Sequence, residues 1–242
     1  MESAQSSSET PPQSGNQGLI VRAFAQALTL PVLLIFVLFF PAGTANWPMA
    51  WLLMIAYLGG MLLTNLWLAA RHPGLARERL IIPRSSEKWD LRLIGIVNFL
   101  LLAAMLPLSG WDHRYGWSPA VPTAVSIGAL LLFLAMFGFM AWSMSANEFF
   151  SSTVRLQSDR GHAVSDKGPY RRLRHPGYLA MILQFLAIPV ILGSMWALIP
   201  ALSVGAVYLY RTDREDKFLR EHLPGYAEYA NRVRFRLIPG VW

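Results

Sequence analysis

The chain has 242 residues, of which 54% are hydrophobic and 14% are charged. Soluble globular proteins carry charge on about a quarter of their residues, so this composition excludes an ordinary soluble enzyme and indicates an integral membrane protein. The formal net charge of +7 is better explained by basic residues gathered on one side of a membrane than by nucleic-acid binding, and the lack of cysteine excludes disulfides and thiolate chemistry.

Residues 1–18 are rich in Ser, Gln, Pro and Gly, so we expect a disordered tail there. This segment does not resemble a signal peptide, because it is acidic where a basic region is needed and the apolar run starts too late. For the rest of the chain we expect a four-helix membrane region over residues 19–145 and a C-terminal region over residues 146–242.

Six apolar segments follow the tail, and several approach or exceed the length of about 18–20 residues that crosses a bilayer as a helix. Because lipid offers no hydrogen bonds to the backbone, such segments must be helical. The predicted fold is therefore an all-α integral membrane protein with about six transmembrane helices, the last two short and joined as a hairpin at Gly193 and Ser194. The segments are 23–40, 47–70, 93–110, 119–145, 178–193 and 195–210.

The basic residues support one orientation of these helices. If the N-terminus lies in the cytosol, every Lys and Arg except Arg114 falls in a cytosolic segment. The positive-inside rule therefore favours a multi-pass protein with both termini in the cytosol. We expect the inner membrane of a bacterium, or the endoplasmic reticulum of a eukaryote.

The motifs of several enzyme classes are missing. The chain contains no GxGxxG, P-loop, HExxH or GxSxG motif, and its predicted cytosolic loops are too short for a separate nucleotide-binding domain. We therefore expect no Rossmann domain, and any cofactor site must be built from helix ends and loops. No set of His, Asp and Glu residues has metal-ligand spacing, so we expect no metal.

A charge-rich stretch, GPYRRLRHPGY over residues 168–178, precedes the fifth apolar segment. Proline favours the first turn of a helix, so His175 and Pro176 mark the start of that helix. The free N–H groups of a helix N-terminus suit a carboxylate or a phosphate. The arginines of the stretch are explained by ordinary flanking charge, whereas Tyr170, His175 and Tyr178 together favour a functional site.

Arg211 and Glu215 follow the sixth apolar segment and share one helix face, because they are four residues apart. Glu215 and Asp216 form an acidic pair in a basic tail, where they could hold an ammonium group or ribose hydroxyls. Arg211 could hold an anionic substrate through a bidentate contact. A weak surface ion pair accounts for the same residues equally well.

These motifs resemble those of a known family. GPYRRLRHPGY, the later R-x-x-x-E-D, LPGYAEYANRV and the ending RLIPGVW resemble the isoprenylcysteine carboxyl methyltransferases and their bacterial relatives, a group that includes phospholipid N-methyltransferases. The resemblance is firm over residues 145–242 and extends more weakly over residues 47–145. It implies a helical membrane fold, an S-adenosylmethionine site built from the C-terminal loops, and a lipid-like or prenylated substrate. The oligomeric state stays open.

The resemblance also implies roles for individual residues. Arg211 would bind the carboxylate that is methylated, and Glu215 would bind the cofactor, with Asp216 standing where the family often has a second Glu. Arg211 and Glu215 are thus the candidate catalytic residues. Further cofactor contacts are implied for His162, Ala163, Val164, Ser165, Tyr170, His175, Pro176, Gly177 and Tyr178.

The implied reaction moves a methyl group from a sulfonium to the acceptor in one displacement. A carboxylate acceptor is already anionic at neutral pH and needs no base, which mildly favours it. An amine such as phosphatidylethanolamine must lose a proton, for which His175 or Glu215 could serve. Two other readings stay open: an NADPH-dependent sterol-reductase-like enzyme, because some reductases carry a similar HPxY element, and a non-catalytic membrane protein whose motif only caps helices.

Overall fold

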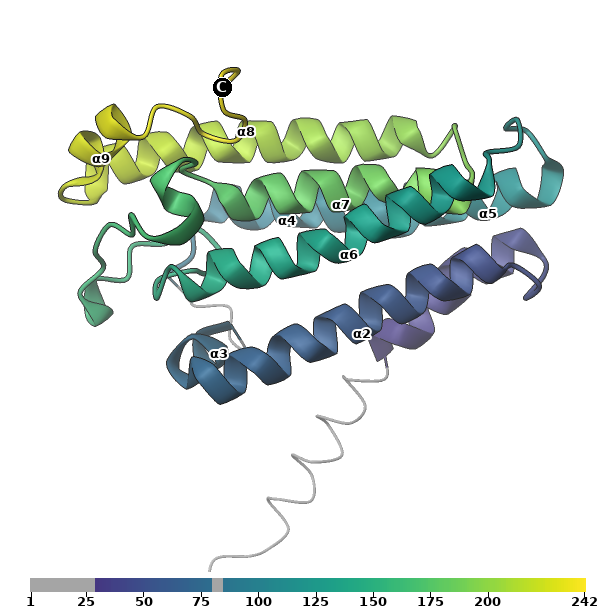
Figure 1. The fold of residues 1–242 in the computed structure, drawn as a ribbon, viewed down its shortest axis with the longest axis horizontal. Helices are drawn as coiled ribbons and strands as arrows, with labels where there is room; N and C mark the ends of the chain where they lie inside the picture. The colour runs from purple at the N-terminus through teal and green to yellow at the C-terminus, as the bar shows by residue number, and fades with distance from the viewer. Residues whose placement is uncertain (1–28, 80–84) are drawn as a thin grey trace, which may run out of the picture.

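The computed structural model describes residues 29–79 and 85–242, and every regular element within them is helical. The tail predicted over residues 1–18 lies outside the described residues. Figure 1 shows the long helices running side by side along the length of the molecule. The predicted fold class, an all-α integral membrane protein, is confirmed.

The long helices differ in how well they fit a bilayer. Among the described residues, three are apolar and long enough to cross it, and two others are apolar but shorter, so the prediction of six complete crossings stays a prediction. The three are α2 (Pro48–Arg71), the continuous run Lys88–Tyr115 and α6 (Thr123–Ser145). The run Lys88–Tyr115 consists of α4 (Lys88–Phe99), the π-helical turn η1 (Leu100–Met105) and α5 (Leu106–Tyr115). The shorter ones are the helix Thr29–Ala42 and α7 (Pro176–Leu192).

Helix α8 (Leu198–His222) joins the membrane region to the polar region. Its first half is apolar, and charged residues begin at Arg211 and continue to the end of the helix. The rise of about 1.5 Å per residue makes this helix roughly 37 Å long. One rigid element therefore runs from the apolar bundle into the polar end of the molecule.

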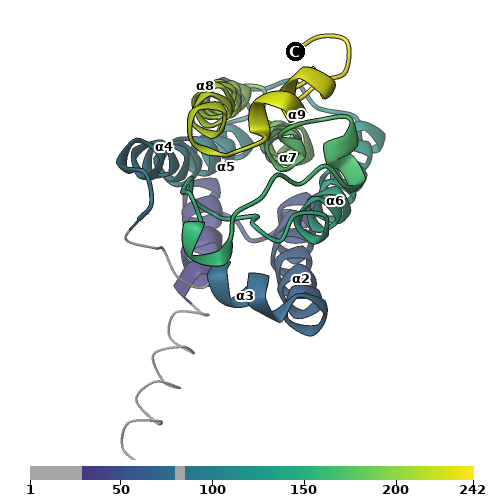
Figure 2. The ribbon, with the colours of Figure 1, turned by 90° about the vertical axis from the view of Figure 1, so that its left-hand side faces the viewer.

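The short elements gather at one end of the bundle, which we call the polar end. They are α3 (Pro73–Arg79), η2 (Ser158–Arg160), η3 (Gly168–Arg171) and α9 (Tyr226–Arg232). Figure 2, which looks onto this end, shows the loop after α6 and the C-terminal segment lying across the ends of the helices. The stretches whose residues the sequence singled out therefore meet in one place.

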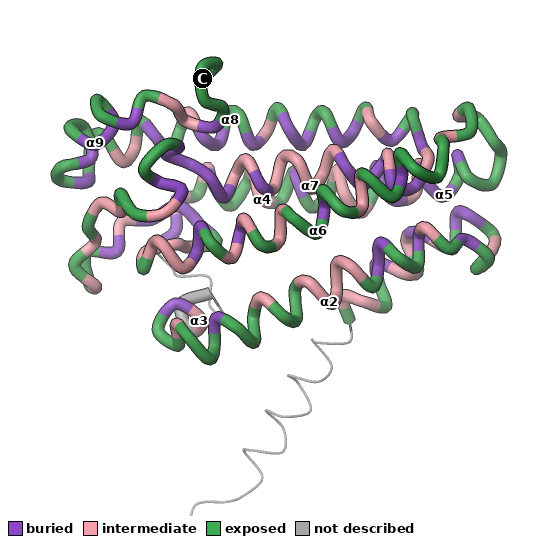
Figure 3. Tube along the Cα trace, viewed as in Figure 1, coloured by how far each residue is buried: buried purple, intermediate pink, exposed green. Residues whose placement is uncertain are grey.

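The core lies between the long helices, and their outer faces are apolar. Helix α7 packs against α6 and α8, with Ala180, Ala187 and Ala201 buried at these contacts. Figure 3 shows exposed residues along the outward faces of the long helices, and large apolar side chains such as Leu62 and Leu131 are among them. Exposed apolar side chains on long helices are what lipid contact requires, since lipid is the solvent there.

The end opposite the polar end closes with a buried carboxylate. Gly193 takes a left-handed conformation, with a φ of 72°, and turns the chain from α7 towards α8. Asp112 of α5 accepts hydrogen bonds from the hydroxyls of Ser194 and Ser118, each at 2.5 Å. This contact fixes the short hairpin expected at Gly193 and Ser194, and it ties the hairpin to α5.

Candidate active site

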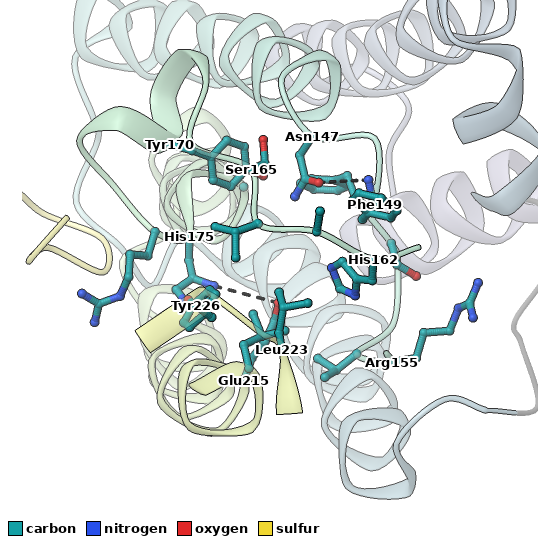
Figure 4. A pocket seen from close by; sticks show the side chains of 18 of the residues that line it. Asn147, Phe149, Arg155, His162, Ser165, Tyr170, His175, Glu215, Leu223 and Tyr226 are labelled. Atoms are coloured by element: carbon teal, nitrogen blue, oxygen red, sulfur yellow. Dashed lines mark hydrogen bonds and ion pairs between the residues drawn. The ribbon is translucent and has the colours of Figure 1, made fainter. Parts of the chain in front are cut away.

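A cavity opens at the polar end, between the loop after α6, the start of α7, the second half of α8 and α9. Figure 4 shows side chains from all of these segments pointing towards one another around it. The cavity brings together every residue for which the resemblance implied a cofactor contact, with the exception of Pro176. Those lining it are His162, Ala163, Val164, Ser165, Tyr170, His175, Gly177, Tyr178 and Glu215.

The start of α7 is held by the C-terminal segment. The backbone N–H of Arg174 donates to the carbonyl of Phe235 at 3.0 Å, and that of His175 donates to the carbonyl of Arg236 at 2.9 Å. Pro176 occupies the first turn of α7, as its missing N–H allows. It is buried in the wall rather than exposed to the cavity, so it shapes the site by setting where the helix begins.

Gly177 gives the wall its close packing. A Cβ atom at this position would lie 2.9 Å from the ring of Phe150, a separation that real Cβ atoms do not adopt. The absence of a side chain therefore allows Phe150 to lie against the first turn of α7. Phe150 itself lines the cavity, so the glycine controls the position of a wall residue.

Glu215 is the carboxylate that faces the cavity. The hydroxyl of Tyr178 donates to its Oε2 atom, and Nδ1 of His175 lies 4.0 Å from its Oε1 atom (Figure 4). The rings of His175 and Tyr178 are nearly parallel, with centroids 5.7 Å apart. Three residues from two helices thus form one group, in which Glu215 keeps accepting capacity for a ligand because a carboxylate can accept about four hydrogen bonds.

Asp216, the next residue, has a different role from Glu215. Its side chain is fully buried outside the cavity lining, and its oxygens accept from Nε and NH2 of Arg174 at 2.7 and 3.1 Å. Burial alone would raise the pKa of Asp216, but hydrogen bonds and charge from His175 and Arg174 outweigh burial and hold that pKa well below its usual range. Its other partners are His175, Arg220, Tyr226 and Arg236.

Arg211 lies behind the cavity wall and is already paired. Its Nε and NH2 atoms donate to the two oxygens of Asp90 at 2.5 and 2.9 Å, a bidentate ion pair between α8 and α4. The guanidinium lies 4.9 Å from the centre of the Tyr178 ring, and Val154, which lines the cavity, donates its N–H to Asp90 at 2.8 Å. Contact between Arg211 and a substrate carboxylate stays a prediction, and such a carboxylate would compete with Asp90.

Sequence reasoning did not identify Asp90 as a site residue, nor the aromatic and apolar wall. Asp90 and Arg211 are 121 residues apart, so no local pattern connects them. The wall residues carried a weak signal, because Tyr226 and Tyr229 are three apart and share a face of α9. The missed lining residues include Phe149, Phe150, Thr153, Val154, Arg155, Leu219, Leu223, Tyr226 and Tyr229.

His162 approaches the cavity from the loop after α6. Its ring packs on Phe149 with centroids 4.7 Å apart, and its Nδ1 atom accepts from the N–H of Gln157 at 3.3 Å. Burial, and then the charges of Arg155 and Arg160, lower the pKa of His162 below its usual value. The imidazole is therefore neutral at pH 7 and offers an uncharged, flat ring face to the cavity.

The described residues, 29–79 and 85–242, contain no group of three or more His, Asp and Glu side chains that could hold a metal ion. The titratable groups at the cavity instead form pairs with tyrosine, arginine or each other. This arrangement suits an organic ligand with a cationic or hydroxyl group.

Comparison with known proteins supports the resemblance seen in the motifs. Residues 124–225 match the phospholipid methyltransferase family, which is related to the isoprenylcysteine carboxyl methyltransferases, so the predicted resemblance is confirmed at this level. The chain is also 26% identical over 139 residues to the cobalt-zinc-cadmium resistance protein CzcN of Cupriavidus metallidurans; this covers 57% of the chain and 58% of that protein. The family match covers α6, α7 and α8, the helices whose ends surround the cavity.

Proposed function

From the match of residues 124–225 to a family of membrane methyltransferases, we infer that this protein transfers a methyl group from S-adenosylmethionine to a lipid-borne acceptor. One observation carries the inference: a cavity built from residues of the matched segment and α9 lies at the end of an apolar helical bundle. A water-soluble cofactor and a membrane-bound acceptor can both reach such a place.

The residues of the cavity fit the cofactor in kind. Glu215 is an acceptor for an ammonium group or for ribose hydroxyls, and it is oriented by the Tyr178 hydroxyl. Tyr170, Phe149 and the neutral His162 offer ring faces of the sort on which an adenine stacks. A sulfonium cation is also stabilised by aromatic faces.

When bound, S-adenosylmethionine supplies an electrophilic methyl group; its carbon–sulfur bond breaks as the bond to the acceptor forms, and the electron pair stays on sulfur. The protein's own contribution is positioning and exclusion of water, which together can supply much of the rate. Glu215 and Tyr178 hold the site from α8 and α7, and Phe150 and Val154 close its wall. Asp90 and Arg211 fix that wall from behind.

Two classes of acceptor are compatible with these residues. The carboxylate of an isoprenylcysteine-like lipid needs no base, and Arg211 would orient it after displacing Asp90. The amine of a phospholipid such as phosphatidylethanolamine is favoured by the existing Asp90–Arg211 pair, which already neutralises Arg211. For an amine, the leaving proton could pass to Glu215 or to His175, whose Nε2 atom lies 3.4 Å from Asp216.

The first test is calorimetric titration of S-adenosylhomocysteine into the detergent-purified protein, wild type beside Glu215→Gln. We expect binding in the micromolar range for wild type and a loss of at least about tenfold in the variant, since a charged acceptor is removed. Glu228→Gln, an exposed position on α9, is the matched control and should bind as wild type does.

Other outcomes would point elsewhere. Folded wild-type protein that ignores S-adenosylhomocysteine but binds NADPH would replace this proposal with the reductase. Failure to bind either ligand would favour a non-catalytic membrane protein. If the cofactor binds, incubation with methyl-labelled cofactor and a lipid extract separates the acceptors, because a methyl ester releases methanol in alkali and an N-methyl group does not.

A further inference from the structure

The C-terminal segment forms a second concave site on the outer side of the bundle. After α9, the chain turns back over the bundle (Figure 1), and Arg236 ties it to α8 through Asp213 and Asp216. The hollow that results, which we call the arginine groove, is lined by four arginines, and no acidic residue is among the described residues of its lining. It is lined by Arg174, Arg220, Ala230, Asn231, Arg234, Phe235, Arg236, Val241 and Trp242.

Positive charge exceeds negative charge around the arginine groove. Three of its arginines, Arg174, Arg220 and Arg236, converge on the single buried carboxylate of Asp216. Arg236 has a second partner in Asp213, at 3.3 Å, but Asp213 is shared with Lys217 at 2.7 Å. These three arginines and Lys217 thus share the carboxylates of Asp213 and Asp216. The excess of positive charge should attract anions to the groove.

Several guanidinium donors of the groove are still available. Arg220 uses its Nε atom for Asp216 at 3.2 Å, while its side chain is 38% exposed. Within the described part of the chain, the side chain of Arg234 is exposed and has no acidic partner. Since a guanidinium has five N–H donors, Arg220 and Arg234 can together bind the oxygens of a phosphate.

Apolar side chains lie next to these donors. Ile238 and Val241, in the same loop, are 48% and 76% exposed, and the Trp242 ring lies under the guanidinium of Arg236 at 4.9 Å. Exposed aliphatic side chains beside arginines and a tryptophan are the combination found where proteins meet the headgroup region of a bilayer. A free phosphate ion would use the arginines and leave these apolar side chains in water.

The position of the arginine groove along the axis of the bundle also fits contact with the headgroup region. The Arg236–Asp213 ion pair holds the loop against α8 three residues after Tyr210, where the apolar half of that helix ends. Three residues correspond to about 4.5 Å along the helix axis. The groove therefore lies at the boundary between the apolar bundle and the polar end.

We propose that the arginine groove binds the phosphate of an anionic phospholipid from the adjoining leaflet, with Ile238 and Val241 against its acyl chains. Arg220 and Arg234 supply the available donors, and Arg236 lies against the Trp242 ring. Among the described residues, the groove shares only Arg174 with the lining of the candidate active site, and the proposal does not depend on which reaction the protein catalyses.

Native mass spectrometry of the full-length, detergent-purified protein tests the proposal. The probes are dioleoyl phosphatidylglycerol, dioleoyl phosphatidylcholine and inorganic phosphate, each titrated separately. Wild type should bind phosphatidylglycerol at least about tenfold more tightly than phosphatidylcholine, and Arg220→Gln/Arg234→Gln should lose most of that preference. Arg171→Gln/Arg172→Gln, which removes two exposed arginines outside the groove, is the matched control and should retain it.

Two further results test whether the groove binds a lipid, and a single variant is held in reserve. Ile238→Ser/Val241→Ser should weaken phosphatidylglycerol binding by several fold, and no effect of this variant would overturn the lipid assignment. If inorganic phosphate binds as tightly as phosphatidylglycerol, the groove is a simple anion site and the lipid assignment is wrong. If the double arginine variant does not fold, Arg234→Gln alone still tests the proposal, because within the described residues the Arg234 side chain is exposed and its one hydrogen bond, from Arg174, is to the backbone carbonyl.

Discussion

Glu215 and Asp216 are neighbours in α8 with opposite surroundings. Successive residues of a helix point about 100° apart, so Glu215 faces the cavity while Asp216 turns into a cluster of arginines. From the sequence alone, Glu215 and Asp216 form one acidic pair with the same charge, so nothing local distinguishes their roles. What separates them is the tertiary position of Arg174 and Arg236, which come from other parts of the chain.

Replacement of Asp216 by Asn should destabilise the protein by about 3–5 kcal/mol, because several buried donors then lack a charged partner. The measurement is the free energy of unfolding in detergent. Since the folded-state pKa of Asp216 lies below its unfolded value of about 3.9, its stabilising contribution is complete above that pH and is lost only as pH falls through the folded-state pKa. The deficit should therefore be constant from about pH 5 to pH 8.

Asp213→Asn is the control for this variant, since it lies in the same helix and pairs with Lys217 and Arg236 nearer the surface. It should cost less than about 1 kcal/mol. Equal losses for the two variants would show that Asp216 is not the centre of the cluster.

The pair Asp90–Arg211 should behave as a single unit. Asp90→Asn and Arg211→Gln should each destabilise strongly, while the double variant should cost less than the sum, with a coupling energy of at least about 1.5 kcal/mol. A double-mutant cycle on unfolding measures this coupling. Additive losses would mean that Arg211 acts independently of Asp90 and is free to bind a substrate.

Among the helices, hydropathy located the apolar segments well, whereas tertiary packing determined where the charged half of α8 ends. The apolar segments over residues 47–70 and 119–145 coincide with α2 and α6 within a few residues, because length and composition are enough to define a lipid-facing helix. The same criterion placed the end of the last apolar segment at residue 210. Helix α8 continues to His222, as the shared helix face of Arg211 and Glu215 required, and the buried partners of Asp216 and Arg211 stabilise its charged half.

The first turn of α7 offers a test at this scale. Gly177→Ala should weaken binding of S-adenosylhomocysteine and lower stability by about 1–3 kcal/mol, because the new methyl group displaces the Phe150 ring. Combining it with Phe150→Leu, which gives the methyl group room, should restore part of the stability. Gly138→Ala in α6, where a Cβ meets open space, should be neutral or slightly stabilising.

For the whole molecule, the sequence predicted which segments meet at the polar end but not how they make a wall. The positive-inside argument placed the loop after α6, the start of α7 and the end of α8 on one side of the membrane, and the described structure brings them to the same end of the bundle. The aromatic wall and the Asp90–Arg211 pair depend on contacts between distant residues, for which a single sequence has no signal.

Orientation in the membrane can be tested directly, since the natural chain has no cysteine. Ser158 in η2 at the polar end and Ala120 in the loop at the opposite end are both exposed, so each can be replaced by Cys. In intact bacterial cells, a membrane-impermeant maleimide should label residue 120 and label residue 158 only after lysis. The reverse pattern would place the cavity outside the cell and contradict the proposed topology.

The length of α8 has a consequence for the acceptor. Because the helix continues without a break from its apolar half to Glu215, the cavity stands at a fixed height, with Glu215 about 7.5 Å along the axis beyond Tyr210. A lipid whose reactive atom lies within a headgroup's reach of the hydrocarbon boundary meets that height while its chains stay in the bilayer. If the protein methylates a lipid as proposed, we expect it to reject an acceptor whose reactive atom stands on a long, extended headgroup, because that atom would lie beyond the cavity.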